Sequence, residues 1–423
     1  MRSSLLFLAL ALLTACDRPG GESGAPPRSE VALVPVARDS GGVTILEHPA
    51  GALERAPLIA FDSVPFAEVR GDSTSDDLSR VFAGVALSDG GFAFFDPVRA
   101  GVWIVDSVGT LRRVIGRRGE GPGEFEEVES GVARGVDDTL AVTDRSTARV
   151  TILHPTGGVV RQAPIDVSHS GNGYALNGGL PDGSWVASPS SWVIVGMGAP
   201  AFGLERGVPV LHVDPFAAPP RRDSVGFLTS LKAVRVVTKM RGREERGVVI
   251  PEFTNPGRGF AWGGKVALYD NHRWELVLTP PVAGGQRSVI RVVDGARHST
   301  PALLDSVAAE RRRRSERVIA AGRTPMETPE EAEFNARSTP MAEVVAPFGR
   351  EYVAPRGTLW LVDQMVPGDP TLGMTALDTA GRLLGRAFLP PSSEIVAVGE
   401  DRVLLRHKGE DDVVVLRIHR LRR

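Results

Sequence analysis

The sequence predicts an all-β protein built from six similar strand units, and three observations lead to that expectation. Glycine (48) and proline (32) are abundant among the 423 residues, and patterns typical of long helices are few. This composition favours many short strands joined by turns. In addition, two neighbouring stretches of the chain align with each other, and a strand–turn–strand pattern recurs six times.

The aligned stretches are FAFFDPVRAGVWIVDSVG at residues 92–109 and LAVTDRSTARVTILHPTG at residues 140–157. They match without a gap at an offset of 48 residues, so that Asp96 corresponds to Asp144. Each stretch has the pattern of a strand, a turn led by aspartate, a second strand with alternating apolar positions, and a glycine turn. The two stretches therefore represent one structural unit used twice.

The strand–turn–strand pattern occurs in six places, each marked by a tight turn. Asp-Gly, Gly-Gly and Arg-Gly pairs supply the positive φ values that hairpin turns need. The turns lie near Gly90, Asp138, Gly183, Gly264, Gly357 and Asp401, at spacings of 48, 45, 81, 93 and 44 residues. A period of about 45 residues with several strands per unit is typical of a β-propeller, whose stacked blades bury one another's faces. The two long spacings predict insertions at about 188–250 and, with helical character, at about 300–345.

The second insertion contains a predicted helix at residues 301–322, PALLDSVAAERRRRSERVIAAG. Leu303 and Val307 are expected to pack on the propeller. Arg311–Arg314 and Arg317 form a basic cluster on the same helix. The cluster is either a contact for anionic lipid or an acidic partner, or a solvated face balanced by nearby glutamates.

The stretch GRRGEGPGEF, Gly116–Phe125, joins the first complete unit to the next. Its glycines let the chain leave the edge of one blade and enter the centre of the next, where Phe125 can anchor it between blades. A phosphate-binding loop would end in G-K-[ST], which is missing, and five nearby glutamates would repel a phosphate. The longer stretch DSVGTLRRVIGRRGEGPGEF resembles the NHL repeat of six-bladed propellers, and residues 41–423 resemble bacterial exported six-bladed propeller lipoproteins.

The N-terminus has the pattern of an export signal. Arg2 is followed by a short apolar run, Leu5–Leu13, which is too short to span a bilayer. The run ends in LTAC, which resembles the lipobox of bacterial lipoproteins. The resemblance implies cleavage before Cys16 and a diacylglycerol on its sulfur. The alternative is an ordinary secretory signal with an incidental cysteine.

These features predict three segments: a lipoprotein signal peptide at 1–15, a flexible tether at 16–40, and the propeller at 41–423. The tether is expected because residues 17–40 are rich in Gly, Pro, Ser and charge, a composition too polar to pack. The expected location is the outer side of a bacterial membrane, periplasmic or cell-surface, with the lipid on Cys16 as the anchor.

Charge and motif content argue against several functional classes. Basic (49) and acidic (51) residues nearly balance, so no global field favours nucleic acid. Cys16 is the only cysteine, which excludes an intrachain disulfide. The eight histidines show neither H-E-x-x-H nor H-x-H spacing, and G-x-S-x-G is missing. We therefore expect no nucleic-acid partner, no cofactor and no zinc site.

The candidate ligand-binding residues are the basic and aromatic side chains in the turns after the second strands: Arg99, Arg145, His272, Arg273, Trp274 and His407. Loops from several blades line one mouth of a propeller's channel, so equivalent turns can share a surface for a small polar or anionic ligand, or for a protein. The alternative is that these turns lie at separate blade tips. Trp274 is either a ligand contact or a plug between blades.

Aspartates end the second strand in four units: Asp96, Asp144, Asp270 and Asp363. They could form a ring of carboxylates. Repetition favours the alternative, in which each caps the turn that follows it.

The last unit supplies only three strands before the chain ends. An open sheet edge is a liability, so an N-terminal segment is expected to add the fourth strand. The candidates are GVTILEH at 42–48 and PLIAFDS at 57–63.

Together these observations predict a membrane-anchored extracytoplasmic propeller that binds a ligand or scaffolds a protein partner. The alternative is a metal-dependent hydrolase or lyase. Some six-bladed propellers of related shape are lactonases or lyases that hold a metal in the central channel with Glu, Asn, Asp or His. None of their motifs could be matched to residues of this chain.

Overall fold

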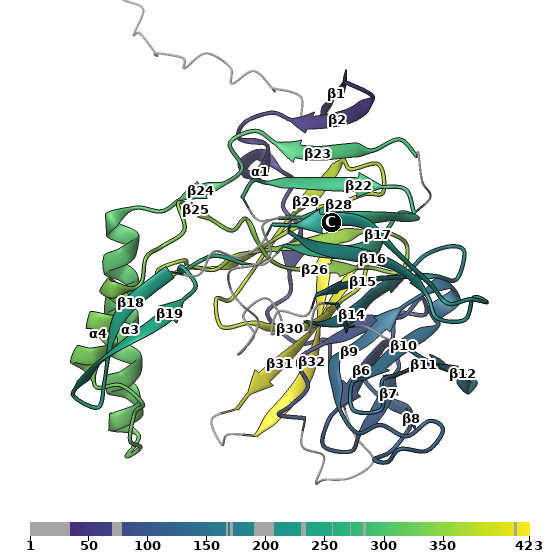
Figure 1. The fold of residues 1–423 in the computed structure, drawn as a ribbon, viewed down its shortest axis with the longest axis horizontal. Helices are drawn as coiled ribbons and strands as arrows, with labels where there is room; N and C mark the ends of the chain where they lie inside the picture. The colour runs from purple at the N-terminus through teal and green to yellow at the C-terminus, as the bar shows by residue number, and fades with distance from the viewer. Residues whose placement is uncertain are drawn as a thin grey trace, which may run out of the picture. The chain divides into compact units, whose positions relative to one another are not determined.

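Six antiparallel sheets follow one another along the chain and form the predicted six-bladed β-propeller (Figure 1). The computed structural model describes residues 34–69, 78–165, 168–169, 172–189, 207–229, 234–255, 257–270, 272–281, 285–409 and 413–423. The first strands of successive blades contact one another around a central axis, in chain order. Blades 2 and 5 therefore face each other across that axis.

The first three blades each begin with the strand nearest the axis. Blade 1 consists of β5 (Gly84–Ala86), β6 (Phe92–Asp96), β7 (Gly101–Val105) and β8 (Leu111–Ile115). Blade 2 consists of β9 (Val128–Arg134), β10 (Leu140–Asp144), β11 (Arg149–His154) and β12 (Gly158–Pro164). Blade 3 consists of β14 (Asn172–Gly179), β15 (Trp185–Pro189), β16 (Val208–Asp214) and β17 (Arg221–Leu228), with the short β13 (Ser168–His169) beside β14.

The last three blades keep the same order from the axis outward. Blade 4 consists of β20 (Arg258–Trp262), β21 (Lys265–Tyr269), β22 (Glu275–Thr279) and β23 (Ser288–Val292). Blade 5 consists of β26 (Phe348–Val353), β27 (Leu359–Asp363), β28 (Leu372–Leu377) and β29 (Leu383–Leu389). Blade 6 begins with β30 (Glu394–Val398), β31 (Arg402–Lys408) and β32 (Val414–Arg422).

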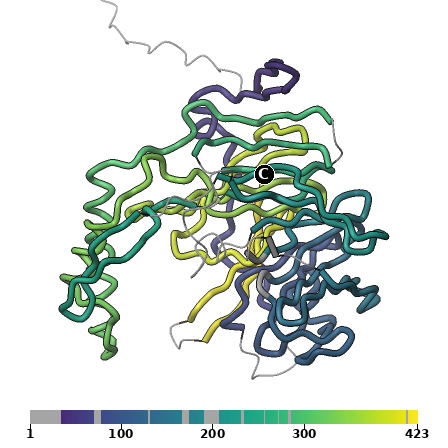
Figure 2. The backbone as a smooth tube through the Cα atoms, viewed as in Figure 1, coloured from purple at the N-terminus to yellow at the C-terminus, as the bar shows by residue number. Residues whose placement is uncertain are grey.

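Blade 6 is completed by the N-terminal part of the chain. β3 (Ala60–Phe61) and β4 (Ala67–Glu68) pair antiparallel with β32. In Figure 2 this segment (purple) runs beside the C-terminal strands (yellow). Of the two segments expected from the sequence, PLIAFDS is thus the one that closes the ring.

The other candidate segment, GVTILEH, extends a different blade. It forms β2 (Val43–His48), which pairs parallel with β23 of blade 4, and β1 (Val36–Ser40) pairs with β2 at the outside. α1 (Ala52–Arg55) then leads the chain towards β3. The N-terminal region therefore supports two blades rather than one.

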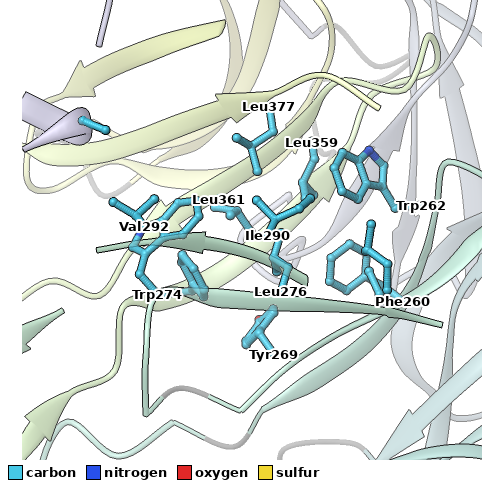
Figure 3. Packing of buried hydrophobic residues seen from close by; sticks show 14 residues of the cluster. Phe260, Trp262, Tyr269, Trp274, Leu276, Ile290, Val292, Leu359, Leu361 and Leu377 are labelled. Atoms are coloured by element: carbon cyan, nitrogen blue, oxygen red, sulfur yellow. The ribbon is translucent and has the colours of Figure 1, made fainter. Parts of the chain in front are cut away.

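The core lies between blades, where apolar faces of neighbouring sheets meet. Figure 3 shows one such cluster, in which Trp274 and Leu276 of blade 4 lie with Leu359 and Leu361 of blade 5. All four side chains are at most 2% exposed. Each blade thus buries its faces against its two neighbours, as stacking predicts.

The connector Gly116–Phe125 has the structural role that its glycines predict. Phe125 is fully buried and meets Phe95 edge-on, with ring centroids 5.8 Å apart. Gly116 has φ 95°, and a Cβ there would lie 2.4 Å from the Phe125 ring. The Glu124 carboxylate accepts hydrogen bonds from Gly121 N at 2.9 Å and from Arg117 Nε at 2.8 Å. The Glu124 carboxylate thus takes the loop donors that a bound phosphate would otherwise use.

The insertions form one accessory unit beside the blades (Figure 1, left). α3 (Pro301–Ala320) packs on α4 (Pro329–Ser338), and α4 packs on β18 (Val234–Met240) of the hairpin completed by β19 (Arg243–Val249). β24 (Arg297–His298) and β25 (Val344–Val345) pair at the base of the helices. Among the described residues, no helix has the length and apolar character needed to cross a bilayer.

A buried asparagine joins the two insertions. Asn335 on α4 is 3% exposed, and its amide accepts from Lys239 N at 2.6 Å and donates to Lys239 O at 2.7 Å. Glu331 accepts from Gly242 N at 2.6 Å at the tip of the same hairpin. These bonds replace the partner strand that β18 lacks on that side.

Candidate ligand-binding site in the central channel

The innermost strands place polar backbone groups around the axis. β5, β9, β20, β26 and β30 have a partner strand on one side only, and β14 pairs with β13 only at its start. The unpaired N–H and C=O groups of such an edge remain available for hydrogen bonds. The channel is therefore polar even where its side chains are small.

A cavity of about 270 Å³ lies at one end of this channel. It is lined mainly by the first strands and by several of the turns that lead into the second strands. All six blades contribute to it: Gly84, Val132, Leu176, Phe260, Tyr352 and Val398 are representatives. Small-molecule sites are concave, mostly apolar and fitted with a few polar groups. The cavity is concave and has such polar groups, but more of its accessible lining is polar than apolar.

The charged side chains of the described lining are three arginines and one glutamate: Arg134, Arg258, Arg350 and Glu351. Their formal sum is positive by two charges. Each arginine lies on the first strand of its blade, so the fold presents all three to the channel.

Arg258 and Glu351 form a neutral pair that joins blades 4 and 5. Arg258 Nε lies 3.3 Å from the Glu351 carboxylate, whose side chain is 8% exposed. The Tyr269 hydroxyl donates to the same carboxylate at 2.6 Å. Glu351 raises the pKa of Arg258, and burial raises the pKa of Tyr269 well above its usual range. The Glu351 carboxylate is thus already bonded to Arg258 and Tyr269.

Arg134 reaches across the channel from blade 2 to blade 5. Its guanidinium donates to the Ala354 carbonyl oxygen at 3.2 Å, while its buried Nε has no hydrogen-bond partner within the described part of the chain. Asp138 lies 3.9 Å away, but its carboxylate already accepts from the amide and hydroxyl of Ser88. Burial lowers the pKa of Arg134, because desolvation disfavours its charge.

Arg350 crosses the channel from blade 5 towards blade 1. It donates to the Phe82 carbonyl oxygen at 3.1 Å, and its guanidinium lies 5.5 Å from the centre of the Tyr352 ring. Arg350 forms no ion pair with any described residue. Arg350 therefore brings positive charge to the cavity without a paired carboxylate, whereas Asp138 offsets part of the charge of Arg134 without accepting a hydrogen bond from it.

The residues predicted from the sequence lie at the opposite ends of the blades. Consecutive strands are antiparallel, so the turns after the second strands are remote from the turns that line the cavity. None of the six candidates is among the described lining residues of the cavity. Binding at them stays a prediction.

The individual contacts of these candidates differ. Arg99 lies over the Trp103 ring at 5.3 Å, and Arg145 lies 3.9 Å from the Glu127 carboxylate. His272, Arg273 and His407 are exposed.

Trp274 is a core residue rather than an exposed ligand contact. It is 2% exposed and meets Phe348 of blade 5 edge-on at 5.0 Å. This is the plug between blades that the sequence left as the alternative. Cys16 lies outside the described residues.

The aspartates that end the second strands cap their turns in three units. Asp96 Oδ1 accepts from Val98 N at 2.8 Å, and Asp144 Oδ1 accepts from Ser146 N at 3.0 Å. Asp270 accepts from a turn amide at 3.4 Å. Asp363 differs, because it accepts from the Arg386 guanidinium of its own blade.

The basic cluster on α3 is largely balanced by neighbouring acids. Arg312 pairs with Glu316, Glu330 and Glu333, all within 3.2 Å. Arg313 and Arg317 share Glu310, and Arg311 pairs with Glu252. These ion pairs favour the solvated helix face over a basic docking surface.

A serine–histidine pair that the sequence did not suggest lies in blade 3. Ser184 Oγ is 2.6 Å from His212 Nε2, and Asp182 lies 4.0 Å from the same nitrogen. In a nucleophilic triad the carboxylate orients the histidine through Nδ1, but here Nδ1 is buried without a partner among the described residues. Ser184 is 2% exposed, and Asp182 caps its turn. The geometry is that of a structural turn.

The cavity arginines were also missed, although the sequence carries a faint signal for them. Each lies in the first strand of a unit, in GVARG, GRGFAW and FGREYV. Aligning those first strands across units would have shown charge at positions next to the axis. The prediction instead rested on basic and aromatic residues in the turns after the second strands, which lie at the other end of the blades.

These features define the class of protein: a six-bladed β-propeller with a cationic cavity in its channel. Neither a family model nor a curated protein matches the chain.

Solved structures of similar fold are known at low sequence identity. A Bacteroides fragilis protein, described as exported in its name, is 11% identical over 87% of this chain and 100% of its own, with a TM-score of 0.48. A member of the DUF4221 family from Bacteroides vulgatus is 8% identical over 86% of this chain and 98% of its own, with a TM-score of 0.46. A gluconolactonase from Xanthomonas campestris is 11% identical over 86% and 98%, with a TM-score of 0.35. The assignment of the fold rests on the strand pairing described above.

Among the described residues, no group of three or more histidine, cysteine, aspartate or glutamate side chains is placed to hold a metal ion. Divalent cations favour several carboxylate, carbonyl or imidazole ligands around one point. The only carboxylate among the described lining residues is Glu351, which is bonded to Arg258 and Tyr269. The donor set is suited to an anion.

Proposed function

We propose that the protein is an exported propeller that binds a small polar ligand in its channel cavity. The signal pattern and the LTAC sequence support export and a lipid anchor on Cys16. The observation that carries the binding function is the cavity of about 270 Å³, to which all six blades and three arginines contribute. A cavity shared by all blades forms only in the closed ring, so binding would depend on the fold that the repeats build.

The binding function is tested by narrowing the cavity. Val136 lines the cavity and is 41% exposed, so Val136→Trp adds bulk at the mouth without disturbing the core. Val160 on the outer strand β12 is 56% exposed, and Val160→Trp is the matched control. A library of polar metabolites would be screened by thermal shift, with hits measured by titration calorimetry.

Ligands of the wild-type protein are expected to bind the Val160→Trp variant normally and the Val136→Trp variant weakly or not at all. Equal binding to all three proteins would place the ligand outside the cavity. Analysing each ligand by NMR after incubation separates binding from turnover: recovery of a changed molecule would favour the enzyme alternative.

The proposed anchor has a separate test. Cys16→Ser removes the sulfur that would carry the lipid, so the variant should leave the membrane fraction that holds the wild-type protein. Mass spectrometry of the wild-type N-terminus should show the acylated cysteine. Full retention of Cys16→Ser in the membrane would mean that the protein is held there in another way.

A further inference from the structure

We propose that the ligand is an elongated organic dianion, with a carboxylate at each end, held between Arg134 at the mouth of the cavity and Arg350 deeper in the channel. This inference rests on the proposed binding function and names the class of ligand. It is carried by the lack of a hydrogen-bonded carboxylate on either arginine, by the separation of the two arginines along the axis, and by the acceptors that they now use.

The free donors of the two arginines suit a dianion. Glu351 forms an ion pair with Arg258 at 3.3 Å, whereas neither Arg134 nor Arg350 donates a hydrogen bond to a carboxylate of the described residues. Asp138 lies 3.9 Å from Arg134, close enough to offset part of its charge but too far to accept a hydrogen bond from it. A monocarboxylate would offer a charged acceptor to only one guanidinium, whereas a molecule with a carboxylate at each end offers one to both.

The two arginines act at different depths. Arg134 donates to the carbonyl of Ala354, which lies just beyond the end of β26. Arg350 lies near the start of the same strand and donates to Phe82, which precedes β5. With a rise of about 3.3 Å per residue, the Cα atoms of positions 350 and 354 are separated by ~13 Å along the strand. One compact anion is therefore poorly placed to contact both guanidinium groups, whereas an elongated molecule can.

The present acceptors of both arginines are replaceable. Each guanidinium donates to a neutral backbone carbonyl, and the buried Nε of Arg134 has no partner in the described residues. A carboxylate accepts two parallel N–H bonds from one guanidinium, and these charge-assisted bonds are stronger than bonds to a neutral carbonyl. Ligand carboxylates can thus take over both arginines and satisfy the unpaired nitrogen.

The wall between the two arginines is formed by the inner strands, whose free edges provide polar backbone. Val132, Leu176 and Phe260 belong to this wall, but their side chains are at most 7% exposed because they pack between the blades. The separation of the two arginines, rather than an apolar lining, therefore selects for the length of the ligand.

The experiment is titration calorimetry with α,ω-dicarboxylates from succinate to suberate and with the matching monocarboxylates. The proteins are the full chain and its Arg134→Gln, Arg350→Gln and Arg145→Gln variants. Arg145 is an exposed arginine at the other end of blade 2 and serves as the control. Arg134→Lys keeps the charge but loses the two parallel bonds, and it provides a second variant if Arg134→Gln folds poorly by circular dichroism.

We expect an optimum of affinity at one chain length and weaker binding of every monocarboxylate. Arg134→Gln and Arg350→Gln should each weaken the best dicarboxylate roughly 10- to 100-fold, towards the affinity of its monocarboxylate, and Arg134→Lys should lie between. Arg145→Gln should change nothing.

Failure of this inference can be told apart from failure of the binding function. Equal affinity for monocarboxylates and dicarboxylates, or an effect of only one arginine, would overturn the two-ended ligand. No binding of any dicarboxylate would overturn it too. If neutral metabolites still bind in a way that Val136→Trp abolishes, the cavity remains a binding site. Weaker binding of the dicarboxylate to Arg145→Gln would indicate that the ligand binds at the other face of the propeller, beside Arg145.

Discussion

At the scale of single residues, the connector depends on Gly116 because this position needs both a positive φ and the lack of a Cβ. Its φ is 95°, and a Cβ would lie 2.4 Å from the Phe125 ring that fills the groove between blades 1 and 2. Gly158 has a similar φ of 84°, but a Cβ there would meet nothing within 4 Å. Comparing substitutions at Gly116 and Gly158 therefore separates the cost of backbone strain from the cost of steric overlap.

Gly116→Ala should therefore lower the free energy of unfolding by roughly 2–4 kcal/mol, since strain and overpacking add. Gly158→Ala should cost about 1 kcal/mol, because only the backbone is strained. Urea denaturation of the two variants checks this prediction. Similar losses would show that the Phe125 ring moves aside and that the packing of the connector adds little.

We expect His419 to give the stability of the ring a pH dependence. It is 7% exposed, its Nδ1 lies 2.9 Å from the Asp62 carbonyl oxygen, and its ring stacks on Phe61 of the closing strand β3. Burial lowers the pKa of His419 below its ordinary value of 6.5. Because the folded protein binds this proton less readily than the unfolded chain, protonation favours unfolding.

Stability is accordingly expected to fall as the pH drops below about 6.5 towards the lower folded pKa. His212, whose pKa is also lowered by burial, acts with the same sign. His419→Phe keeps the stacked ring and removes the titrating group, so it should lose less stability between neutral and acidic pH than the wild-type protein. Denaturation curves at several pH values test this, and an unchanged pH dependence would assign the effect to other groups.

At the scale of elements, the ring is closed by short strands that are distant in sequence from the blade they complete. β3 and β4 contribute two residues each, yet they cover the outer edge of β32. Nearby, Ile59 is 1% exposed, and its N–H donates to the Arg386 carbonyl oxygen of blade 5 at 2.7 Å. The segment thus links the last two blades as well as closing the ring.

A series of N-terminal truncations separates these contributions. A chain that begins at residue 34 should have the melting temperature of the longer chain. A chain that begins at residue 56 loses β1 and β2 and should melt at a lower temperature. A chain that begins at residue 70 also loses the closing strands, so the loss should be largest, with the whole domain affected. Equal melting temperatures for the chains that begin at residues 34 and 70 would argue against closure by this segment.

Several elements could be predicted from the sequence because each produces a local signal. Five of the six marked turns contain a residue with positive φ, namely Gly90, Asp138, Gly183, Gly264 and Gly357, and the helix at Pro301–Ala320 carries its own apolar pattern. The closing segment could be narrowed only to two candidates, because an edge strand of two residues has no periodicity of its own. The hydrogen bond between Asn335 and Lys239 could not be predicted from the sequence, because it joins residues 96 positions apart.

At the scale of the whole molecule, the candidate site exists only because the ring is closed. Arg134, Arg258 and Arg350 are separated by long stretches of sequence and lie in three different blades. Nothing near each arginine in the sequence shows that its side chain points along or across the channel. The repeats predicted where the strands lie, but the depth of each residue along the axis depends on the register of every blade.

The ring also explains why the predicted residues and the cavity lie apart. Turns after the second strands and turns after the first strands alternate between the two ends of each blade. Arg145 and Arg134 belong to one blade but lie at its opposite ends. The repeat pattern alone does not show which face of the propeller carries the binding site, because equivalent turns from all blades lie on both faces.

The measurement that tests the central claim most directly is a crystal structure of the protein with the dicarboxylate that binds best. The account predicts one molecule in the channel cavity, with one carboxylate on Arg134 in place of the Ala354 carbonyl and the other on Arg350. A ligand bound at the opposite ends of the blades, beside Arg145 or Arg273, would contradict the account, as would a ligand in the cavity that contacts neither Arg134 nor Arg350.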